Sequence, residues 1–225
     1  MHREVIYTAD GSTTIRIAAW EECYHSKHGA IQEAYHVFIN NGLSTFNGRP
    51  ISILEIGFGT GLNAFITFLE AKKNNQQISY TGVEAFPISG EELMGMNYPC
   101  QLNAADQEPI YKQMHACEWE KAIEISNQFS LTKKKLYFTE ITDTAKFDLI
   151  YFDAFGFQVQ PELWSVDIFK IMFNALKQEG LLVTYAARGI IKRNMQQAGF
   201  KVEKRDGPPG KREMMTAAKN YLQKM

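Results

Sequence analysis

A glycine-rich segment directly after a short apolar run constrains the fold of this chain more than any other feature. The run spans residues 51–56, and glycines follow at positions 57, 59 and 61. Apolar residues then recur at helical spacing, at Leu62, Phe65, Ile66 and Leu69. This order predicts a strand, a tight loop and a helix. Glycines let the backbone turn sharply and approach a ligand, and the first turn of the helix offers free N–H groups to it.

Further segments extend this unit to a doubly wound sheet. Apolar runs of strand length lie at residues 78–85, 147–155 and 181–187. Helical patterns lie at residues 163–176 and 190–198, and each is followed by a glycine. Strands that are apolar on both faces and alternate with helices form parallel sheets. We therefore predict an α/β fold with a mostly parallel sheet, and the two runs near 200–202 and 213–216 predict an antiparallel C-terminal edge strand.

The remaining segments predict additions to this core. A turn at Asp10-Gly11 between two β-prone runs predicts a hairpin within residues 5–20. Apolar periodicity between Gly29 and Gly42 predicts an amphipathic helix. Residues 88–128 contain two helical patterns and no clear strand, so we interpret them as a helical insertion. A length of 225 residues fits a single domain, with an N-terminal extension of residues 1–50 and a core of residues 51–225.

Acidic residues around the glycine loop narrow the class of ligand. The dinucleotide fingerprint G-x-G-x-x-G would need glycine where Leu62 stands. Glu55, just before the glycines, repels phosphates but can face a cationic group such as the ammonium of an amino acid. Glu84 lies 27 residues beyond Gly57, at the end of the second strand, where a carboxylate can accept hydrogen bonds from two ribose hydroxyls.

This loop resembles that of the Rossmann-like methyltransferases, which bind S-adenosylmethionine. The alternative is a glycine turn that only packs the strand against the helix. The resemblance implies that the cofactor contacts come from Glu55, Gly57, Gly59, Gly61, Asn63 and Glu84.

Asp153 ends the strand candidate at 147–155, at the edge where open α/β sheets bind ligands. A carboxylate there can orient an amine or take its proton, and Phe155 and Phe157 can stack on a planar base. The alternative is that Asp153 caps the following turn and that both phenylalanines belong to the core. We expect Trp164 to pack under this loop. Tyr185 either reaches the same pocket or packs in the core.

Longer motifs resemble one particular methyltransferase family. They are LEIGFGTGLN, FDLIYFDAF followed by PELW, TYAARGIIKRNMQQAGF, GKREMM and the N-terminal segment HGAIQEAYHVFINNGL. Together they resemble the methyltransferase domain of the MnmC-type enzymes, which methylate the aminomethyl nitrogen of the wobble uridine of bacterial tRNA. The resemblance implies a Rossmann-like methyltransferase fold, S-adenosylmethionine as cofactor, tRNA as partner, and Asp153 as the catalytic carboxylate. Because no flavin-dependent oxidase domain follows, we expect the stand-alone form.

Two departures from the family pattern affect the site. Gly156-Phe157 replaces the usual Ala-Pro after the D-A-F motif, which changes the substrate loop. The acid that often contacts adenine after the third strand is either Glu140 or Asp143. The alternative functions are a small-molecule amine methyltransferase, an aminopropyltransferase, and a catalytically silent cofactor-binding module.

The distribution of charge bears on tRNA binding. The formal net charge of −1 argues against indiscriminate binding of polyanions. Between residues 188 and 212, however, eight basic residues face two acidic ones, which gives +6 there and −7 elsewhere. The alternative is a solvated surface. The substrate contacts that we predict from this segment are Lys192, Arg193, Lys211 and Arg212.

The sequence disfavours a membrane, secreted or metal-binding protein. No apolar stretch approaches the ~18 residues of a membrane span, and the polar N-terminus lacks the apolar core of a signal peptide. Three cysteines predict no disulfide framework, which favours the cytoplasm. Cys23, His25 and His28 lie close together, but their spacing is unusual for zinc and a fourth ligand is not apparent, so we expect no metal. His28 lies either at the rim of the site or on the surface.

Overall fold

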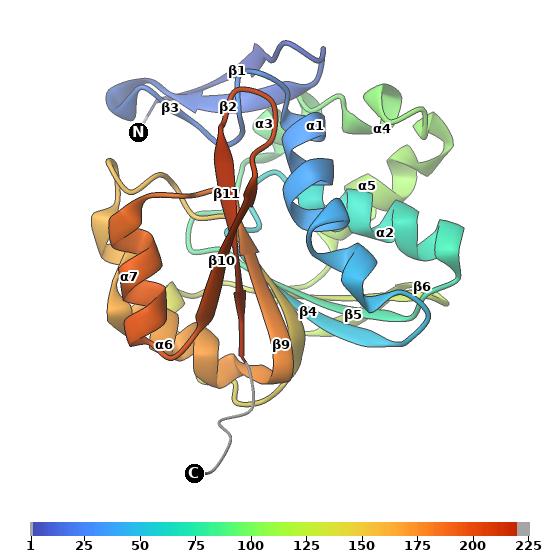
Figure 1. Cartoon of the computed structure of the whole chain (residues 1–225). Helices are drawn as coiled ribbons and strands as arrows, with labels where there is room; N and C mark the ends of the chain where they lie inside the picture. The colour runs from blue at the N-terminus through green and yellow to red at the C-terminus, as the bar shows by residue number, and fades with distance from the viewer. Residues whose placement is uncertain (1, 220–225) are drawn as a thin grey trace.

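The computed structural model describes residues 2–219 and is built around an eight-stranded sheet in the order β10-β11-β9-β8-β4-β5-β7-β6 (Figure 1). The predicted domain begins at residue 1 and ends at residue 225, and both of these residues lie outside the described ones. The strands are β4 (Ile51–Ile56), β5 (Ile78–Val83), β6 (Ala122–Ser126), β7 (Phe129–Lys134), β8 (Phe147–Phe152), β9 (Leu176–Thr184), β10 (Lys201–Asp206) and β11 (Glu213–Ala218).

The five central strands β4, β5, β7, β8 and β9 pair in parallel, which confirms the predicted sheet. The two C-terminal runs form the antiparallel edge that was predicted. Strand β10 is outermost, and β11 lies between β10 and β9 and pairs antiparallel with both.

Helices cover both faces of the sheet, as Figure 1 shows with α2 and α5 on one side and α6 and α7 on the other. Their bounds are α2 (Leu62–Asn74), α5 (Glu108–Ala116), α6 (Val166–Ala175) and α7 (Gly189–Gln197). Neighbouring residues of β4 point to opposite faces, so Ile53 packs in the core beneath α2 while Leu54 packs in the core beneath α6. Each face therefore buries its own apolar layer. Among the described residues, no helix is long and apolar enough to cross a bilayer.

The N-terminal extension contains the predicted hairpin and helix. Strands β1 (Arg3–Tyr7) and β2 (Thr13–Ile17) pair antiparallel, and the short β3 (Glu22–Cys23) joins them. Helix α1 (Ala30–Ala34) continues as the π-helix η2 (Tyr35–Asn40). Single 3₁₀ turns occupy η1 (Ala18–Trp20) and η3 (Leu43–Phe46). In Figure 1 the small sheet lies across the end of the main sheet at which β4 and β5 finish.

The segment 88–128 is helical only in part. It contains α3 (Gly90–Met94), α4 (Tyr98–Gln101), η4 (Ala105–Gln107) and α5, but it ends in strand β6. The prediction of no strand there was wrong, and β7 was also missed. In β7 the side chains of Phe129, Leu131 and Lys133 are buried in alternation with half-buried polar ones. A buried lysine interrupts the apolar signal, and its Nζ donates to the carbonyl of His115.

Candidate active site

A cavity of about 860 Å³ opens where β4, β5 and β8 end. The glycine loop after β4 forms one wall, and the N-terminal extension, including Tyr24, His25 and Glu33, forms the facing one. Eight of the predicted site residues line it: Gly57, Gly59, Asn63, Glu84, Asp153, Phe155, Tyr185 and Lys211. The carboxyl edge of the parallel sheet thus brings together residues that are far apart in the sequence.

The glycine loop approaches the neighbouring backbone too closely for a side chain. Gly57 has φ +87°, and a Cβ there would lie 2.7 Å from the carbonyl oxygen of Asp153. The N–H groups of Gly57 and Phe58 both donate to the carbonyl of Val83, each at 3.0 Å. Glycine at position 57 therefore lets the loops after β4 and β8 meet at the cavity.

Glu84 faces this loop from the end of β5. Its Oε2 accepts a hydrogen bond from the N–H of Gly59 at 3.0 Å, and its Oε1 accepts one from the N–H of Phe86 at 2.8 Å. Both carboxylate oxygens are thus fixed next to the glycine loop, in the place expected for a group that accepts hydrogen bonds from ribose hydroxyls.

Asn63 connects two carboxyl groups at the base of the cavity. Its Nδ2 donates to Oε1 of Glu55 at 3.0 Å and to Oδ2 of Asp153 at 2.9 Å. Glu55 is fully buried behind the cavity wall, and burial raises its pKa well above the usual value. Among the described residues, nothing donates to the second oxygen of Glu55 or pairs with Oδ1 of Asn63. Glu55 therefore lies behind the wall of the cavity and is connected to Asp153 through Asn63.

Asp153 presents its carboxyl group to the cavity at the end of β8. Its backbone N–H donates to the carbonyl of Ile56 at 3.0 Å, which holds the residue against β4. Burial, followed by the negative charge of Glu33, raises the pKa of Asp153 from 3.8 to about 7. A carboxyl group with this pKa can take a proton and release it near neutral pH.

The loop after Asp153 is held at several points. The indole N–H of Trp164 donates to the carbonyl of Phe155 at 2.8 Å, which confirms that Trp164 packs under the loop. The Tyr185 hydroxyl donates to the carbonyl of Ala154, also at 2.8 Å. The Phe155 ring makes edge contacts with Trp20 and Tyr24, with centroid distances of 5.5 and 5.1 Å. The phenylalanine of the D-A-F motif thus joins β8 to the N-terminal extension.

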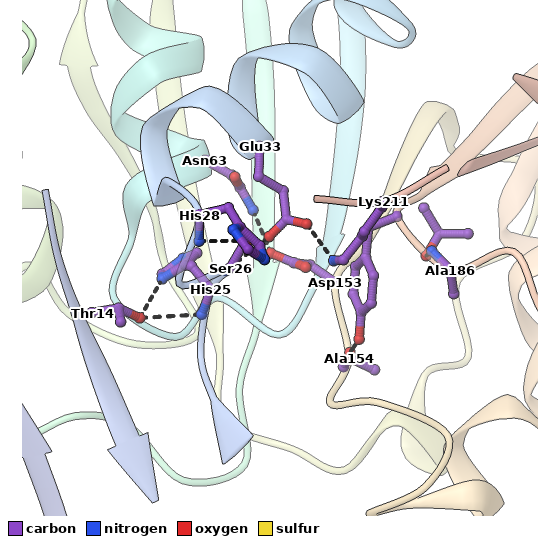
Figure 2. A network of polar contacts seen from close by, with 12 residues as sticks. Thr14, His25, Ser26, His28, Glu33, Asn63, Asp153, Ala154, Ala186 and Lys211 are labelled. Carbon is purple, nitrogen blue, oxygen red and sulfur yellow. Dashed lines mark hydrogen bonds and ion pairs between the residues drawn. The ribbon is translucent and has the colours of Figure 1, made fainter. Parts of the chain in front are cut away.

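Lys211 points into the cavity. It comes from the turn between β10 and β11, and its Nζ pairs with Oε1 of Glu33 (Figure 2). The same Nζ lies 3.8 Å from the centroid of the Tyr185 ring. The sequence predicted Lys211 as a substrate contact within a basic segment, and the structure places it beside Asp153.

Other predicted residues lie outside the cavity. Arg188 covers the Phe157 ring at 5.8 Å, and Gly61 caps α2 at a φ of +71°. Asp143 pairs with Lys134 and Lys146, while Glu140 accepts from the N–H of Tyr137, so neither acid faces the cavity. Residues 137–139, directly before Glu140, do line the cavity. The full set of predicted contacts outside it is Glu55, Gly61, Phe157, Lys192, Arg193 and Arg212.

Glu33 was missed by the sequence analysis, although its position carried a signal. It lies on the apolar face of its helix, at the i+3 position from Ala30 and next to Ala34, and it is buried. An acid within an apolar stripe needs a partner.

His25 was considered only as a metal ligand. Burial lowers its pKa to about 4, so the ring is neutral, and its Nδ1 lies 3.1 Å from the Thr14 hydroxyl. Within residues 2–219, no group of three or more metal-ligating side chains is found.

Comparisons with known proteins agree with this geometry. A family of S-adenosyl-L-methionine-dependent methyltransferases matches residues 106–220. The tRNA 5-methylaminomethyl-2-thiouridine biosynthesis bifunctional protein MnmC of Burkholderia multivorans is 30% identical over 219 residues, covering 90% of this chain and 33% of the relative. The MnmC protein of Leptospira borgpetersenii is 28% identical over 214 residues, covering 88% and 32%. The chain thus spans about a third of the length of these relatives.

Solved structures share the fold. MNMC2 from Aquifex aeolicus superposes with a TM-score of 0.78 at 23% identity, covering 96% of this chain and 69% of that one. Spermidine synthase from Thermotoga maritima gives a TM-score of 0.55 at 13% identity, covering 96% and 73%. Both share the doubly wound sheet.

The fold and the site together define a methyltransferase. The chain belongs to the family of S-adenosyl-L-methionine-dependent methyltransferases, and S-adenosylmethionine is its cofactor. Its resemblance to the methyltransferase domain of MnmC-type proteins is confirmed by the relatives found. The residues present fit this cofactor, because Gly57 leaves the loop without a side chain and Glu84 places a carboxylate beside Gly59.

Proposed function

We propose that this protein methylates the aminomethyl nitrogen of the wobble uridine of tRNA, as one domain formed by the N-terminal extension and the sheet. The observation that carries the proposal is the Asp153 carboxyl group, which faces the cavity with a pKa near neutrality, across from the glycine loop and Glu84. The two MnmC relatives are named for the biosynthesis of 5-methylaminomethyl-2-thiouridine in tRNA, which supports this substrate. A tRNA substrate also implies a cytoplasmic enzyme.

When bound, S-adenosylmethionine would supply the methyl group, carried on a sulfonium sulfur, that the amine nitrogen receives. Gly57, Gly59 and Glu84 would hold the cofactor, with Asn63 orienting the neighbouring carboxyl groups. An aliphatic amine is mostly protonated at neutral pH and must lose a proton before it can attack. Asp153 would accept that proton at its carboxylate and keep the nitrogen lone pair directed into the cavity.

The base would enter between the loop that follows β8 and the N-terminal extension. Phe155 lines the cavity there and offers an aromatic surface to a planar base. Lys192, Arg193 and Arg212 lie outside the cavity and would contact the phosphates of the surrounding nucleotides. Lys192 and Arg193 are on α7, whereas Arg212 is on the turn before β11.

Nucleoside mass spectrometry of tRNA from cells that lack this protein tests the proposal. We expect aminomethyl-uridine to accumulate in these cells, and purified protein with S-adenosylmethionine should convert it to methylaminomethyl-uridine in the isolated tRNA. An unchanged nucleoside profile would reject the proposal. Methylation of the free nucleoside as efficient as that of tRNA would instead indicate a small-molecule amine methyltransferase.

A further inference from the structure

Within the cavity, the ammonium group of Lys211 contacts the Glu33 carboxylate and the ring of Tyr185, and Asp153 lies beside it. Its Nζ is paired with the Glu33 carboxylate and lies 3.8 Å from the centroid of the Tyr185 ring. Asp153 is close enough for its ionisation to respond to the charges of both Glu33 and Lys211. All four residues line the cavity, and Figure 2 shows Lys211 and Glu33 beside Asp153.

These groups are unequally fixed. The Glu33 side chain is only 10% exposed, and its second oxygen accepts a hydrogen bond from the N–H of Ser26 at 2.9 Å. The Tyr185 hydroxyl is held by the carbonyl of Ala154. Lys211, by contrast, has a side chain that is 32% exposed, on a flexible four-carbon stem. The Glu33 carboxylate and the Tyr185 ring therefore form a rigid binding site, whereas the ammonium group of Lys211 can move.

The Lys211 side chain ends in the same chemical group as the methyl acceptor. A lysine side chain ends in a methylene group bearing a primary ammonium, and so does an aminomethyl substituent. If Lys211 leaves, the buried Glu33 carboxylate loses its cationic partner, which is unfavourable unless another cation replaces it. The protonated aminomethyl group supplies such a cation, and the face of Tyr185 adds cation–π attraction for it.

We propose that Glu33, Asp153 and Tyr185 form the binding site for the ammonium group of the substrate, and that Lys211 fills this site until the substrate displaces it. The proposal rests on the function proposed above and deepens it. One proton then passes from the substrate ammonium to the Asp153 carboxylate, which leaves a neutral amine. Lys211 is thus an internal competitor of the substrate rather than a phosphate contact.

Two stem–loop RNAs test the inference, one with 5-aminomethyluridine at the wobble position and one with uridine there. Their dissociation constants are measured by fluorescence anisotropy with S-adenosylhomocysteine present, so that no turnover occurs. Wild-type protein should prefer the aminomethyl RNA. Glu33→Gln should reduce this preference roughly tenfold, because a hydrogen bond to a charged group is lost. Lys211→Met should increase the preference, because the competitor is gone. Neither variant should change the affinity for the uridine RNA.

The control is Lys73→Met, which removes an exposed lysine from the last turn of α2, where it pairs with Glu70 at 3.3 Å. This variant should bind both RNAs as the wild type does. Binding of S-adenosylmethionine, measured by calorimetry, checks that each variant is folded. Lys211→Met alters a partly exposed side chain, so it keeps the test valid even if Glu33→Gln does not fold.

Several results would overturn the inference. If Lys211→Met weakens the binding of both RNAs equally, Lys211 is a phosphate contact. If it weakens only the aminomethyl RNA, Lys211 assists the substrate instead of competing with it. An unchanged preference in Glu33→Gln would also reject the site, even if the wild type methylates the aminomethyl RNA. In contrast, wild-type protein that neither prefers nor methylates that RNA would overturn the proposed function as well.

Discussion

Replacement of Asp153 by asparagine should remove methyl transfer and yet stabilise the folded protein above neutral pH. Burial and the charge of Glu33 raise the pKa of Asp153 to about 7 in the folded state. In the unfolded chain the carboxyl group ionises near its usual value of 3.8. Between these two pH values the folded state therefore binds the extra proton, so the contribution of Asp153 to stability is fully present below 3.8 and is lost as the pH rises to about 7. Asparagine is neutral throughout and avoids this loss.

The surroundings of Asp153 set the size of the effect. The groups that face or act on it are Glu33 on α1, Glu55 on β4, Asn63 on α2, Tyr80 on β5, Tyr185 after β9 and Lys211 before β11. Raising the pKa of Asp153 from 3.8 to about 7 corresponds to at most about 4 kcal/mol. Water in the cavity screens part of this, so we expect a gain of about 2 kcal/mol for Asp153→Asn near pH 8. For a chain of this size, that raises the unfolding midpoint by roughly 4 to 8 °C.

Thermal unfolding of the ligand-free proteins, followed by circular dichroism from about pH 4 to pH 9, measures this difference. The advantage of Asp153→Asn should grow between about pH 4 and pH 7 and stay constant above. Asp167→Asn, which changes an exposed acid on α6, serves as the control and should follow the wild type. Parallel curves for Asp153→Asn and the wild type across the whole range would refute the raised pKa. Retention of full methyl transfer by Asp153→Asn would refute its role as proton acceptor.

Two further predictions concern the cofactor and the tRNA. Gly59→Val should abolish binding of S-adenosylmethionine in calorimetry, because a β-branched side chain enters the cradle at a φ of +48°. Gly48→Val places the same residue at a φ of +79° with nothing within 4 Å, so it should retain binding, and equal losses in both would mean that backbone strain alone is responsible. Charge reversal of Lys192, Arg193 and Arg212 should weaken tRNA binding and lower the slope of log K against log salt concentration by roughly two. An unchanged slope would show that these residues do not contact phosphates.

The parts of the fold that follow local rules could be predicted from the sequence. The apolar strands β4 and β8, the glycine loop and α2 each carry a local pattern, and the loop requires glycine at position 57 because the carbonyl oxygen of Asp153 lies so close. Strand β7 could not be predicted in this way, because it contains the buried Lys133. The hydrogen-bond partner of this lysine, the carbonyl of His115, lies 18 positions away in the sequence. The position of β11 inside the sheet depends on pairing with both β9 and β10, which no local pattern specifies.

The candidate site, like the fold, could be predicted from the sequence only in part. Gly57, Glu84 and Asp153 follow strands of the sheet, so their meeting at one edge follows from the fold class. The pairing of Glu33 with Lys211 does not, because it depends on how the N-terminal extension packs against the turn between β10 and β11. Lys211 lies in a run of basic residues, and its charge alone indicated a phosphate contact. Only the tertiary structure distinguishes it from Lys192, which lies outside the cavity.

The junction between the α1–η2 segment and the β10–β11 hairpin has a consequence for the order in which the cavity is completed during synthesis. His36 bonds to the carbonyl of Asp206 at 2.8 Å, and Glu33 pairs with Lys211 across 178 positions of sequence. Residues 57–84 leave the ribosome long before these contacts can form. The part of the cavity wall that Glu33 and Lys211 line is therefore completed only after the last two strands have been synthesised.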